Sequence, residues 1–352
     1  MGMARMNLCS EHLRRAIELA RRGEGHTRPN PPVGAVIVRG GKVVGEGWHR
    51  RCGGDHAEVA AIKDAARRGE KVRGATMYVT LEPCSRPGRV GACTDAIAAA
   101  GIGRVAFAVS DPNPKNRGRA RRVLARAGVE CVMPSRANTA QGEWDCCDGM
   151  ESALAEARLL IAPFAKHVTT GLPYVTVKLA MSLDGKICDD WGDAKWVSSA
   201  RSRKAVGWER TRVDAIMVGA ETVRRDNPSL LSHSRRNDDL IRVVVSKSGK
   251  LPKGAQVFTD GAPNRTLVFR GVREALEELG RMGAMHVLCE GGLKLATSLA
   301  DAGLVDAWIA VTAPIVIGSR RIADALRFRI RPGSCGILFD DDRIGEYCLS
   351  RG

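Results

Sequence analysis

Aromatic side chains are scarce in this sequence: phenylalanine, tryptophan and tyrosine together make up 4% of its 352 residues. Proteins that hold single-stranded nucleic acid stack the bases on aromatic rings, so this shortage argues against such a role. Apolar runs are also short. None reaches the length of a membrane helix, and the opening residues lack the apolar core of a signal peptide. We therefore expect a cytoplasmic protein that has no membrane partner.

Acidic residues are fewer than basic ones. The chain has 39 aspartates and glutamates against 55 lysines and arginines, which gives a net charge of +16 and a pI near 9.7. Such a balance can indicate nucleic-acid binding, but the basic residues are spread along the chain. A phosphorylated small molecule and a nicotinamide cofactor also need basic surroundings. We expect a small-molecule substrate and do not expect nucleic acid as the main partner.

The 11 cysteines follow no regular spacing, and their number is odd. A disulfide framework is therefore not expected, and most of the cysteines are interpreted as reduced thiols of an intracellular protein. The hydrophobic content of 44% and the charged content of 27% are typical of globular domains. A chain of this length is expected to form two domains, each with a sizeable core.

One histidine, one glutamate and two cysteines carry the strongest chemical signal. His56 and Glu58 are separated by one residue, and Pro83-Cys84 is followed by Cys93 after eight intervening residues. Imidazole and thiolate suit Zn²⁺, and three protein ligands leave a fourth position for water, whose pKa the metal lowers toward ~7. His-x-Glu followed by Pro-Cys-x-x-Cys is the signature of zinc deaminases of nucleobases. In this sequence the two cysteines are further apart, with eight residues between them.

Each of these residues alone has an ordinary explanation. A lone histidine is usually a surface or capping residue, and a lone cysteine is usually a buried thiol. Their joint order indicates a hydrolytic zinc site. We expect His56, Cys84 and Cys93 to bind one zinc ion per chain and Glu58 to move protons. Helix starts are expected at both ligand groups, where they would stabilise thiolates.

Hydrophobic periodicity divides the chain into two α/β patterns. We expect residues 1–145 to form a three-layer α/β/α domain and residues 173–352 to form a second α/β domain. Residues 146–172 are expected to be a connector with a helical piece at 150–161. In the first domain we expect helices at 11–22, 56–68, 93–100 and 117–127 and strands at 33–38, 42–47, 75–81, 105–109 and 129–133. In the second we expect helices at 200–212, 271–280 and 292–302 and strands at 174–179, 215–218, 241–246, 266–269, 286–289, 305–316 and 336–350.

Further motifs of the first domain identify a family. They are Pro29-Asn30-Pro31-Pro32-Val33-Gly34, His49, His56-Ala57-Glu58, Thr80-Leu81-Glu82-Pro83-Cys84, Cys93 and Asp111-Pro112-Asn113-Pro114. Together they resemble the bifunctional riboflavin biosynthesis proteins, which join a diaminohydroxyphosphoribosylaminopyrimidine deaminase to a 5-amino-6-(5-phosphoribosylamino)uracil reductase. The resemblance implies a cytidine-deaminase-like fold and the zinc ligands given above. It also implies a substrate pocket formed by Asn30, His49, Asp111 and Asn113.

The second domain resembles the reductase half of the same family. The matching motifs are Val177 to Lys186, Arg210, Asp214-Ala215-Ile216, Asp226-Asn227-Pro228 and Glu290-Gly291-Gly292. The resemblance implies a dihydrofolate-reductase-like domain that uses NADPH, and a homo-oligomer. The implied cofactor-binding residues are Ala180, Trp196, Thr222, Asp226, Gly292, Leu293, Lys294, Leu295, Ala296, Thr297 and Ser298. The implied substrate-binding residues are Arg210, Leu230, His233 and Glu290.

A helix that starts near Gly292 makes physical sense for a dinucleotide. Backbone N–H groups at a helix start bind phosphate, and Gly291-Gly292 allows a close approach of the backbone. No G-x-G-x-x-G motif follows a strand, so a Rossmann domain is not indicated.

Two departures from the family pattern concern the reductase pocket. Ala194 replaces a serine, and His233 replaces an arginine that is expected to hold the ribose phosphate. Arginine is a permanent bidentate donor, whereas histidine is largely neutral at pH 7. Three functions therefore stay open: the riboflavin enzyme, a paralogue that deaminates a related pyrimidine in an azapteridine-type pathway with an altered or idle reductase, and a nucleic-acid base deaminase.

The exchange at His233 generates a first prediction. If His233 binds phosphate as imidazolium, the KM of the reductase substrate should rise as the pH climbs past the histidine pKa, near ~6.5 when unperturbed. Loss of one charge-assisted contact weakens binding by roughly 1.5–3 kcal/mol. His233→Arg should therefore lower KM and flatten its pH dependence in a steady-state assay of NADPH oxidation. An unchanged KM between about pH 6 and 8 would show that the phosphate is held elsewhere.

Overall fold

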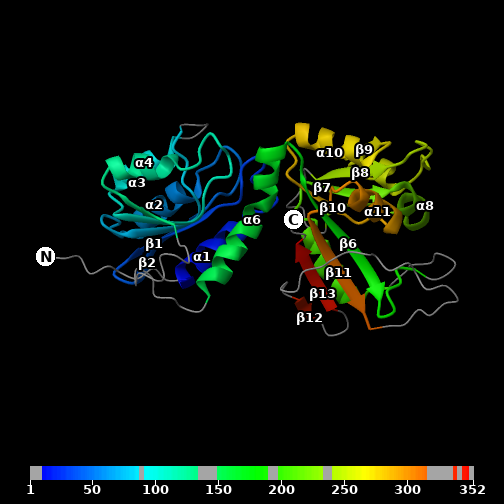
Figure 1. The fold of residues 1–352 in the computed structure, drawn as a ribbon, viewed down its shortest axis with the longest axis horizontal. Coiled ribbons are helices and arrows are strands. Elements are labelled where there is room, and N and C mark those ends of the chain that lie inside the picture. The colour runs from blue at the N-terminus through cyan, green and yellow to red at the C-terminus, as the bar shows by residue number, and fades with distance from the viewer. Residues whose placement is uncertain are drawn as a thin grey trace. The chain divides into compact units, whose positions relative to one another are not determined.

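The computed structural model describes residues 10–86, 91–133, 149–188, 197–232, 240–314, 336–338 and 343–348, the last two segments by their backbone only. The chain divides into two compact units, Met1–Thr170 and Gly171–Gly352 (Figure 1). Each unit is organised around its own sheet. Within the described ranges, none of the helices is long and apolar enough to cross a membrane.

The first unit is built on a five-stranded sheet with the order β2-β1-β3-β4-β5. Strand β1 pairs antiparallel with β2 and β3, and β3, β4 and β5 run parallel. The strands are β1 (Gly34–Arg39), β2 (Lys42–Trp48), β3 (Thr76–Leu81), β4 (Arg104–Val109) and β5 (Glu130–Val132). Strand β3 is buried along its whole length, as expected for a strand with both faces covered.

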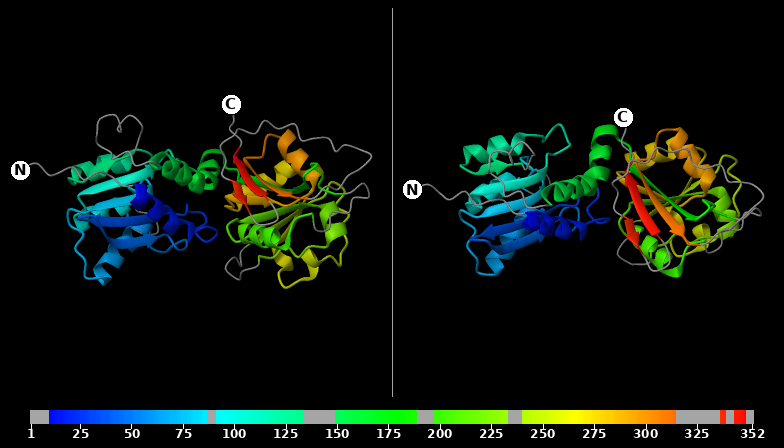
Figure 2. Two further views of the ribbon diagram at one scale, coloured as in Figure 1. Left: turned by 90° about the horizontal axis from the view of Figure 1, so that it is seen from below. Right: turned by 60° about the horizontal axis from the view of Figure 1, so that its bottom comes forward.

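Helices cover both faces of this sheet (Figure 2). They are α1 (Ser10–Arg21), α2 (Ala57–Arg67), α3 (Cys93–Ala100), α4 (Arg119–Arg126) and α6 (Met150–Thr170). Side chains of α1 and α6 share a core with Val36 and Val38 of β1. Side chains of α2, α3 and α4 share the opposite core with Ala35 and Ile37 of the same strand. The alternation along β1 therefore separates two helical layers, and the predicted α/β/α architecture is confirmed.

Helix α2 lies unusually close to strand β2 because two glycines face it. A Cβ atom at Gly45 would lie 2.5 Å from the carbonyl oxygen of Ala61. A Cβ atom at Gly47 would lie 2.5 Å from the carbonyl oxygen of Ala57 and closer still to the backbone nitrogen of Ala61. Real Cβ atoms are not found at such distances, so only glycine permits this packing. The start of α2, with His56 and Glu58, is held at its position by this contact.

Helix α6 occupies most of the segment that the sequence analysis expects to be a connector. It continues beyond residue 161, the expected end of the helical piece, to Thr170, with Pro163 inside it. Its first half supplies Ala153, Leu154 and Ala157 to the core shared with α1. Its second half, residues 162–168, is only half-buried. The apolar pattern loosens there because that part of the helix does not pack into the core.

The second unit contains an eight-stranded sheet with the order β12-β13-β11-β6-β10-β7-β8-β9. Strands β11, β6, β10, β7, β8 and β9 are parallel, and β13 is antiparallel to both β11 and β12. The strands are β6 (Tyr174–Ser182), β7 (Ala215–Gly219), β8 (Ile241–Val245), β9 (Thr266–Phe269), β10 (His286–Cys289), β11 (Ala307–Ala313), β12 (Gly336–Leu338) and β13 (Arg343–Cys348). The expected α/β class is confirmed for this unit too.

The helices of the second unit are α7 (Ala200–Glu209), α8 (Ala220–Asp226), α9 (Gln256–Thr259), α10 (Val272–Arg281) and α11 (Leu293–Asp301), with a 3-10 turn at Pro263–Arg265. Helices α8 and α9 are not predicted from the sequence, because both are too short to show a helical period.

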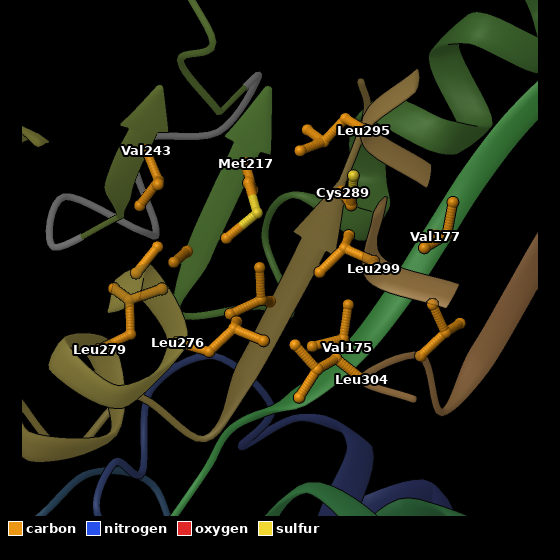
Figure 3. Packing of buried hydrophobic residues seen from close by; sticks show 14 of the residues in the cluster. Val175, Val177, Met217, Val243, Leu276, Leu279, Cys289, Leu295, Leu299 and Leu304 are labelled. Atoms are coloured by element: carbon orange, nitrogen blue, oxygen red, sulfur yellow. The ribbon is translucent and has the colours of Figure 1, made fainter. Parts of the chain in front are cut away.

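A large apolar cluster fixes α10 and α11 on the sheet (Figure 3). Leu276 and Leu279 of α10, with Leu295 and Leu299 of α11, pack against strand residues that include Val175. This packing sets where α11 begins, directly after β10.

The close packing of α2 on β2 leads to a second prediction. Gly47→Ala should force the helix off the strand and lower the free energy of unfolding by about 1–3 kcal/mol, the usual cost of overpacking. Because His56 and Glu58 start the same helix, the zinc content and the deaminase activity that are expected from the sequence should fall with it. Calorimetric unfolding and metal analysis provide the measurements. Gly254→Ala is the matched control, since nothing lies within 4 Å of a Cβ at Gly254. An unchanged unfolding temperature in Gly47→Ala would contradict the prediction.

Candidate functional site

The expected zinc ligands lie together in the first unit. His56 Nδ1 is 3.2 Å from Cys93 Sγ and 3.4 Å from Cys84 Sγ, and the three ligand atoms lie within 4.8 Å of one another. These distances suit three ligands converging on one ion, because Zn–N and Zn–S bonds are roughly 2.0–2.3 Å long. The donor set of one imidazole and two thiols fits Zn²⁺, and the structure selects Nδ1 as the ligating nitrogen.

Three separate elements position these side chains. His56 is the N-cap residue of α2, Cys84 follows the end of β3, and Cys93 is the first residue of α3. The backbone N–H of Cys93 donates to Cys84 Sγ over 3.3 Å. Free N–H groups and the helix dipole favour negative charge at a helix start, so the fold stabilises thiolates at this point.

The two thiols have opposite pKa shifts. The hydrogen bond that the Cys84 sulfur accepts from Cys93 lowers the pKa of Cys84. The same hydrogen bond, together with burial, raises the pKa of Cys93. Two adjacent thiolates repel each other, so one thiol keeps its proton when no cation is present. A divalent ion removes this conflict, because both cysteines bind it as thiolates. The arrangement is therefore suited to a metal.

Glu58 lies beside the ligands and is 3% exposed. Burial, with a smaller contribution from negative charge on Cys84, raises the pKa of its carboxyl group to about 7. A general acid–base group works best when its pKa lies near the working pH. Glu58 belongs to the first turn of α2, so the same helix start positions one ligand and the carboxyl group.

His49 orients the side-chain amide of Asn30. His49 Nδ1 lies 3.0 Å from the carbonyl oxygen of Asp55, and His49 Nε2 lies 3.1 Å from Asn30 Nδ2. A carbonyl oxygen only accepts, so Nδ1 carries the proton. Burial lowers the pKa of His49, which favours the neutral ring. Nε2 then accepts from the Asn30 amide nitrogen, and this leaves Asn30 Oδ1 to accept from a ligand.

The buried carboxylate of Glu82 organises the loop that carries the other expected pocket residues. It accepts hydrogen bonds from the backbone N–H groups of Asp111 at 3.1 Å, Gly118 at 3.1 Å and Ala120 at 3.2 Å. Asp111 Oδ1 in turn accepts from the backbone N–H of Asn113 at 2.8 Å. Burial raises the pKa of Asp111. Glu82 therefore holds the loop against the end of β3, next to Cys84.

A cavity of about 380 Å³ brings these groups together. Asn30, His49, His56, Glu58, Cys84, Asp111 and Asn113 line it, and so do Glu82 and Asn116. Helix α6 contributes three further residues that are not predicted from the sequence, Phe164, His167 and Val168. Their spacing of three and four residues places them on one helical face. This spacing could have indicated a second buried face of the helix, but residues 146–172 were interpreted as a connector.

The second unit has a cavity of about 600 Å³. Arg210 donates to both carboxylate oxygens of Glu290, over 2.7 Å from Nε and 2.9 Å from Nη2. This hydrogen-bonded pair raises the pKa of Arg210 against the opposing effect of burial. The two residues share the cavity wall with Ala180, Thr222, Asp226 and Gly292, all expected there from the sequence, and with Lys178, Ser198 and Arg203, which were not assigned to the site.

Other residues expected in this site are not among those that line the cavity. Leu295 and Ala296 are buried in the core beneath α11, and Leu230 is buried in a second apolar cluster. Leu293, Lys294, Thr297 and Ser298 are on α11 but do not line the cavity. Trp196 and His233, together with Ala194, lie outside the described residues.

Comparisons with known proteins agree with both units. Residues 6–109 match the family model of the cytidine and deoxycytidylate deaminase zinc-binding region, and residues 173–332 match that of the RibD C-terminal domain. The chain is 35% identical over 330 residues to the riboflavin biosynthesis protein RibD of Aquifex aeolicus, covering 87% of each chain. It is 33% identical over 368 residues to that of Escherichia coli, covering 91% of this chain and 94% of the other.

A solved structure is also similar over both units. It is the diaminohydroxyphosphoribosylaminopyrimidine deaminase/5-amino-6-(5-phosphoribosylamino)uracil reductase of Thermotoga maritima. The TM-score is 0.80 at 31% identity, and the match covers 97% of this chain and 98% of the other.

The ligand geometry yields a third prediction. The purified protein should contain about one equivalent of zinc, and Cys84→Ser should lose most of it, because serine is a poor ligand for this metal. Metal analysis by mass spectrometry is the measurement. Cys131→Ser is the matched control, since Cys131 is a half-buried thiol of β5 outside the cluster. Full zinc and full deaminase activity in Cys84→Ser would show that the ligand assignment is wrong.

Proposed function

The chain belongs to the RibD family of riboflavin biosynthesis proteins, and on this premise we propose how its residues divide a deamination and a reduction between the two units. It is a zinc-dependent deaminase and an NADPH-dependent reductase of riboflavin biosynthesis. We assign deamination of 2,5-diamino-6-(5-phosphoribosylamino)pyrimidin-4(3H)-one to Met1–Thr170 and reduction of the ribosyl to the ribityl side chain to Gly171–Gly352. This division places α6 in the deaminase unit. The observation that carries the proposal is the buried Glu58 beside the convergent His56, Cys84 and Cys93.

In the deaminase, Glu58 moves the protons. Bound zinc supplies an activated water by lowering its pKa toward ~7. The Glu58 carboxylate accepts a proton from this water and delivers it to a ring nitrogen. It then accepts the second proton, from the hydroxyl group added to the ring carbon, and delivers it to the departing amine. The exocyclic amine leaves as ammonia and is replaced by oxygen. A carboxyl group with a pKa near 7 can both accept and return a proton at neutral pH.

Asn30 and the Asp111 loop place the pyrimidine ring. Because His49 holds the Asn30 amide nitrogen, Asn30 Oδ1 accepts from an N–H group on the ring edge. Asp111 and Asn113 approach from the loop that Glu82 anchors. The ring is thus held from both sides while its reacting carbon faces His56 and Cys84. Orientation of this kind lowers the entropic part of the barrier.

In the reductase, the Arg210–Glu290 pair defines the substrate side of the cavity. The bidentate contact fixes both side chains, so that Glu290 presents its remaining lone pairs to sugar hydroxyl groups. Bound NADPH supplies the hydride. Thr222, Asp226 and Gly292 line the same cavity and are assigned to the cofactor side. Gly292 precedes the first turn of α11, where backbone N–H groups can bind phosphate.

The alternatives set out from the sequence are less well supported. One alternative was a paralogue with an idle reductase, and the other was a nucleic-acid base deaminase. The relatives favour neither, because riboflavin biosynthesis proteins match this chain at 32–38% identity over at least 87% of its length, across both units. We also propose that the enzyme is a homo-oligomer and that it acts in the cytoplasm, as its irregular cysteines and need for NADPH suggest.

The proton-transfer role of Glu58 is tested by Glu58→Gln, the fourth prediction. Glutamine cannot accept and return the proton, so deamination should fall by about 10²–10⁴-fold, the usual value of acid–base help. Zinc content should be unchanged, and the variant should still reduce the deaminated intermediate, because that step belongs to the other unit. Ammonia release and NADPH oxidation report the two reactions separately. Glu70→Gln, at an exposed position, serves as control. Near wild-type ammonia release from Glu58→Gln would exclude the role.

A further inference from the structure

Helix α6 presents a second functional face to the deaminase cavity. Its core face is fixed by residues such as Leu154 and Ala157. Phe164, His167 and Val168 lie further along the helix, three and four residues apart, and line the cavity. The wall they form belongs to the same unit as the zinc ligands. A residue of α6 can therefore contact whatever fills the cavity beyond the reacting carbon.

His167 differs from the other two histidines of this cavity. The nitrogens of His49 contact Asp55 and Asn30, and His56 Nδ1 faces two cysteines. His167 Nδ1, in contrast, is enclosed and has no hydrogen-bond partner in the part of the chain that the structure describes. Because even water cannot reach Nδ1, a ligand in the cavity would meet the other ring nitrogen, Nε2, which is not enclosed in this way. A hydrogen on Nε2 can be donated to such a ligand.

The wall formed by α6 offers a hydrogen-bond donor in a cavity that is larger than the pyrimidine ring. The cavity volume of about 380 Å³ exceeds the space that a pyrimidine ring needs. Glu58, Glu82 and Asp111 bring carboxyl groups to the lining, and no lysine or arginine is among the described residues there. On the α6 part of this lining, which is Phe164, His167 and Val168, the imidazole N–H is the side-chain donor that can meet the hydroxyl and phosphate oxygens of the phosphoribosyl substituent.

We propose that His167 is a substrate-binding residue of the deaminase, which donates a hydrogen bond from its ring to an oxygen of the phosphoribosyl substituent. The proposal rests on the proposed function, because it takes the phosphoribosylaminopyrimidine as substrate. It assigns to α6 the recognition of the part of the substrate that does not react. The zinc ligands, Glu58 and Asn30 act at the other end, on the ring.

The test, which is the fifth prediction, compares His167→Ala and His167→Gln with the wild-type holoenzyme. Loss of one hydrogen bond should raise the KM for deamination about tenfold in His167→Ala and leave kcat and zinc content unchanged. Glutamine can place its amide nitrogen near the position of Nε2, so His167→Gln should recover most of the affinity. Thr169→Ala is the control, because Thr169 is exposed on the same helix and its hydroxyl donates to the carbonyl oxygens of Ala165 and Lys166 in that helix.

A second ligand locates the contact on the substrate. The free base 2,5,6-triaminopyrimidin-4(3H)-one, measured as a competitive inhibitor, lacks the phosphoribosyl substituent and should bind equally well to wild type and His167→Ala. An equal loss of affinity for the free base would place the contact on the ring and overturn the proposal. An unchanged KM in His167→Ala, or loss of zinc in both variants, would overturn it as well. Absence of ammonia release by the wild type would instead refute the proposed substrate.

Discussion

The structure of the deaminase unit depends on one electrostatic constraint, the need to hold two thiolates and an imidazole within 4.8 Å of one another. Without a cation the two cysteines compete for one proton, so their pKa values move in opposite directions. The starts of α2 and α3 reduce this repulsion, because N–H groups and helix dipoles favour negative charge there. The close contact of α2 with Gly45 and Gly47 then fixes one of these helix starts on the sheet.

Two buried glutamates beside this cluster, Glu82 and Glu58, have different roles because their surroundings differ. The Glu82 carboxylate accepts three backbone hydrogen bonds and ties the Asp111 loop and the start of α4 to the end of β3. Glu58 is equally buried, but its surroundings raise its pKa to about 7. The first group is suited to support the pocket, and the second is suited to transfer protons within it.

Both units use sheet and helix layers to bring residues from distant parts of the sequence to one cavity. In the second unit, Arg210 after α7 meets Glu290 after β10, because parallel strands β7 and β10 are neighbours. In the first, α6 has one stretch in the core and another on the cavity wall. A helix with this dual role shows a weak apolar period, which explains why the sequence indicated a connector there.

The sequence alone was enough to predict the two α/β units, because alternating strand and helix periods record which faces are buried. It also supplied the zinc ligand candidates and Glu58, since few chemistries require these residue types at this spacing. Only the tertiary structure decided that His56 would ligate through Nδ1, that His49 orients the Asn30 amide, and that Leu295 and Ala296 are core residues. It also brought Phe164 and His167 to the cavity. The direction of a side chain depends on how helices and strands pack against one another. So do contacts between residues more than a hundred positions apart, and local sequence patterns do not reveal either.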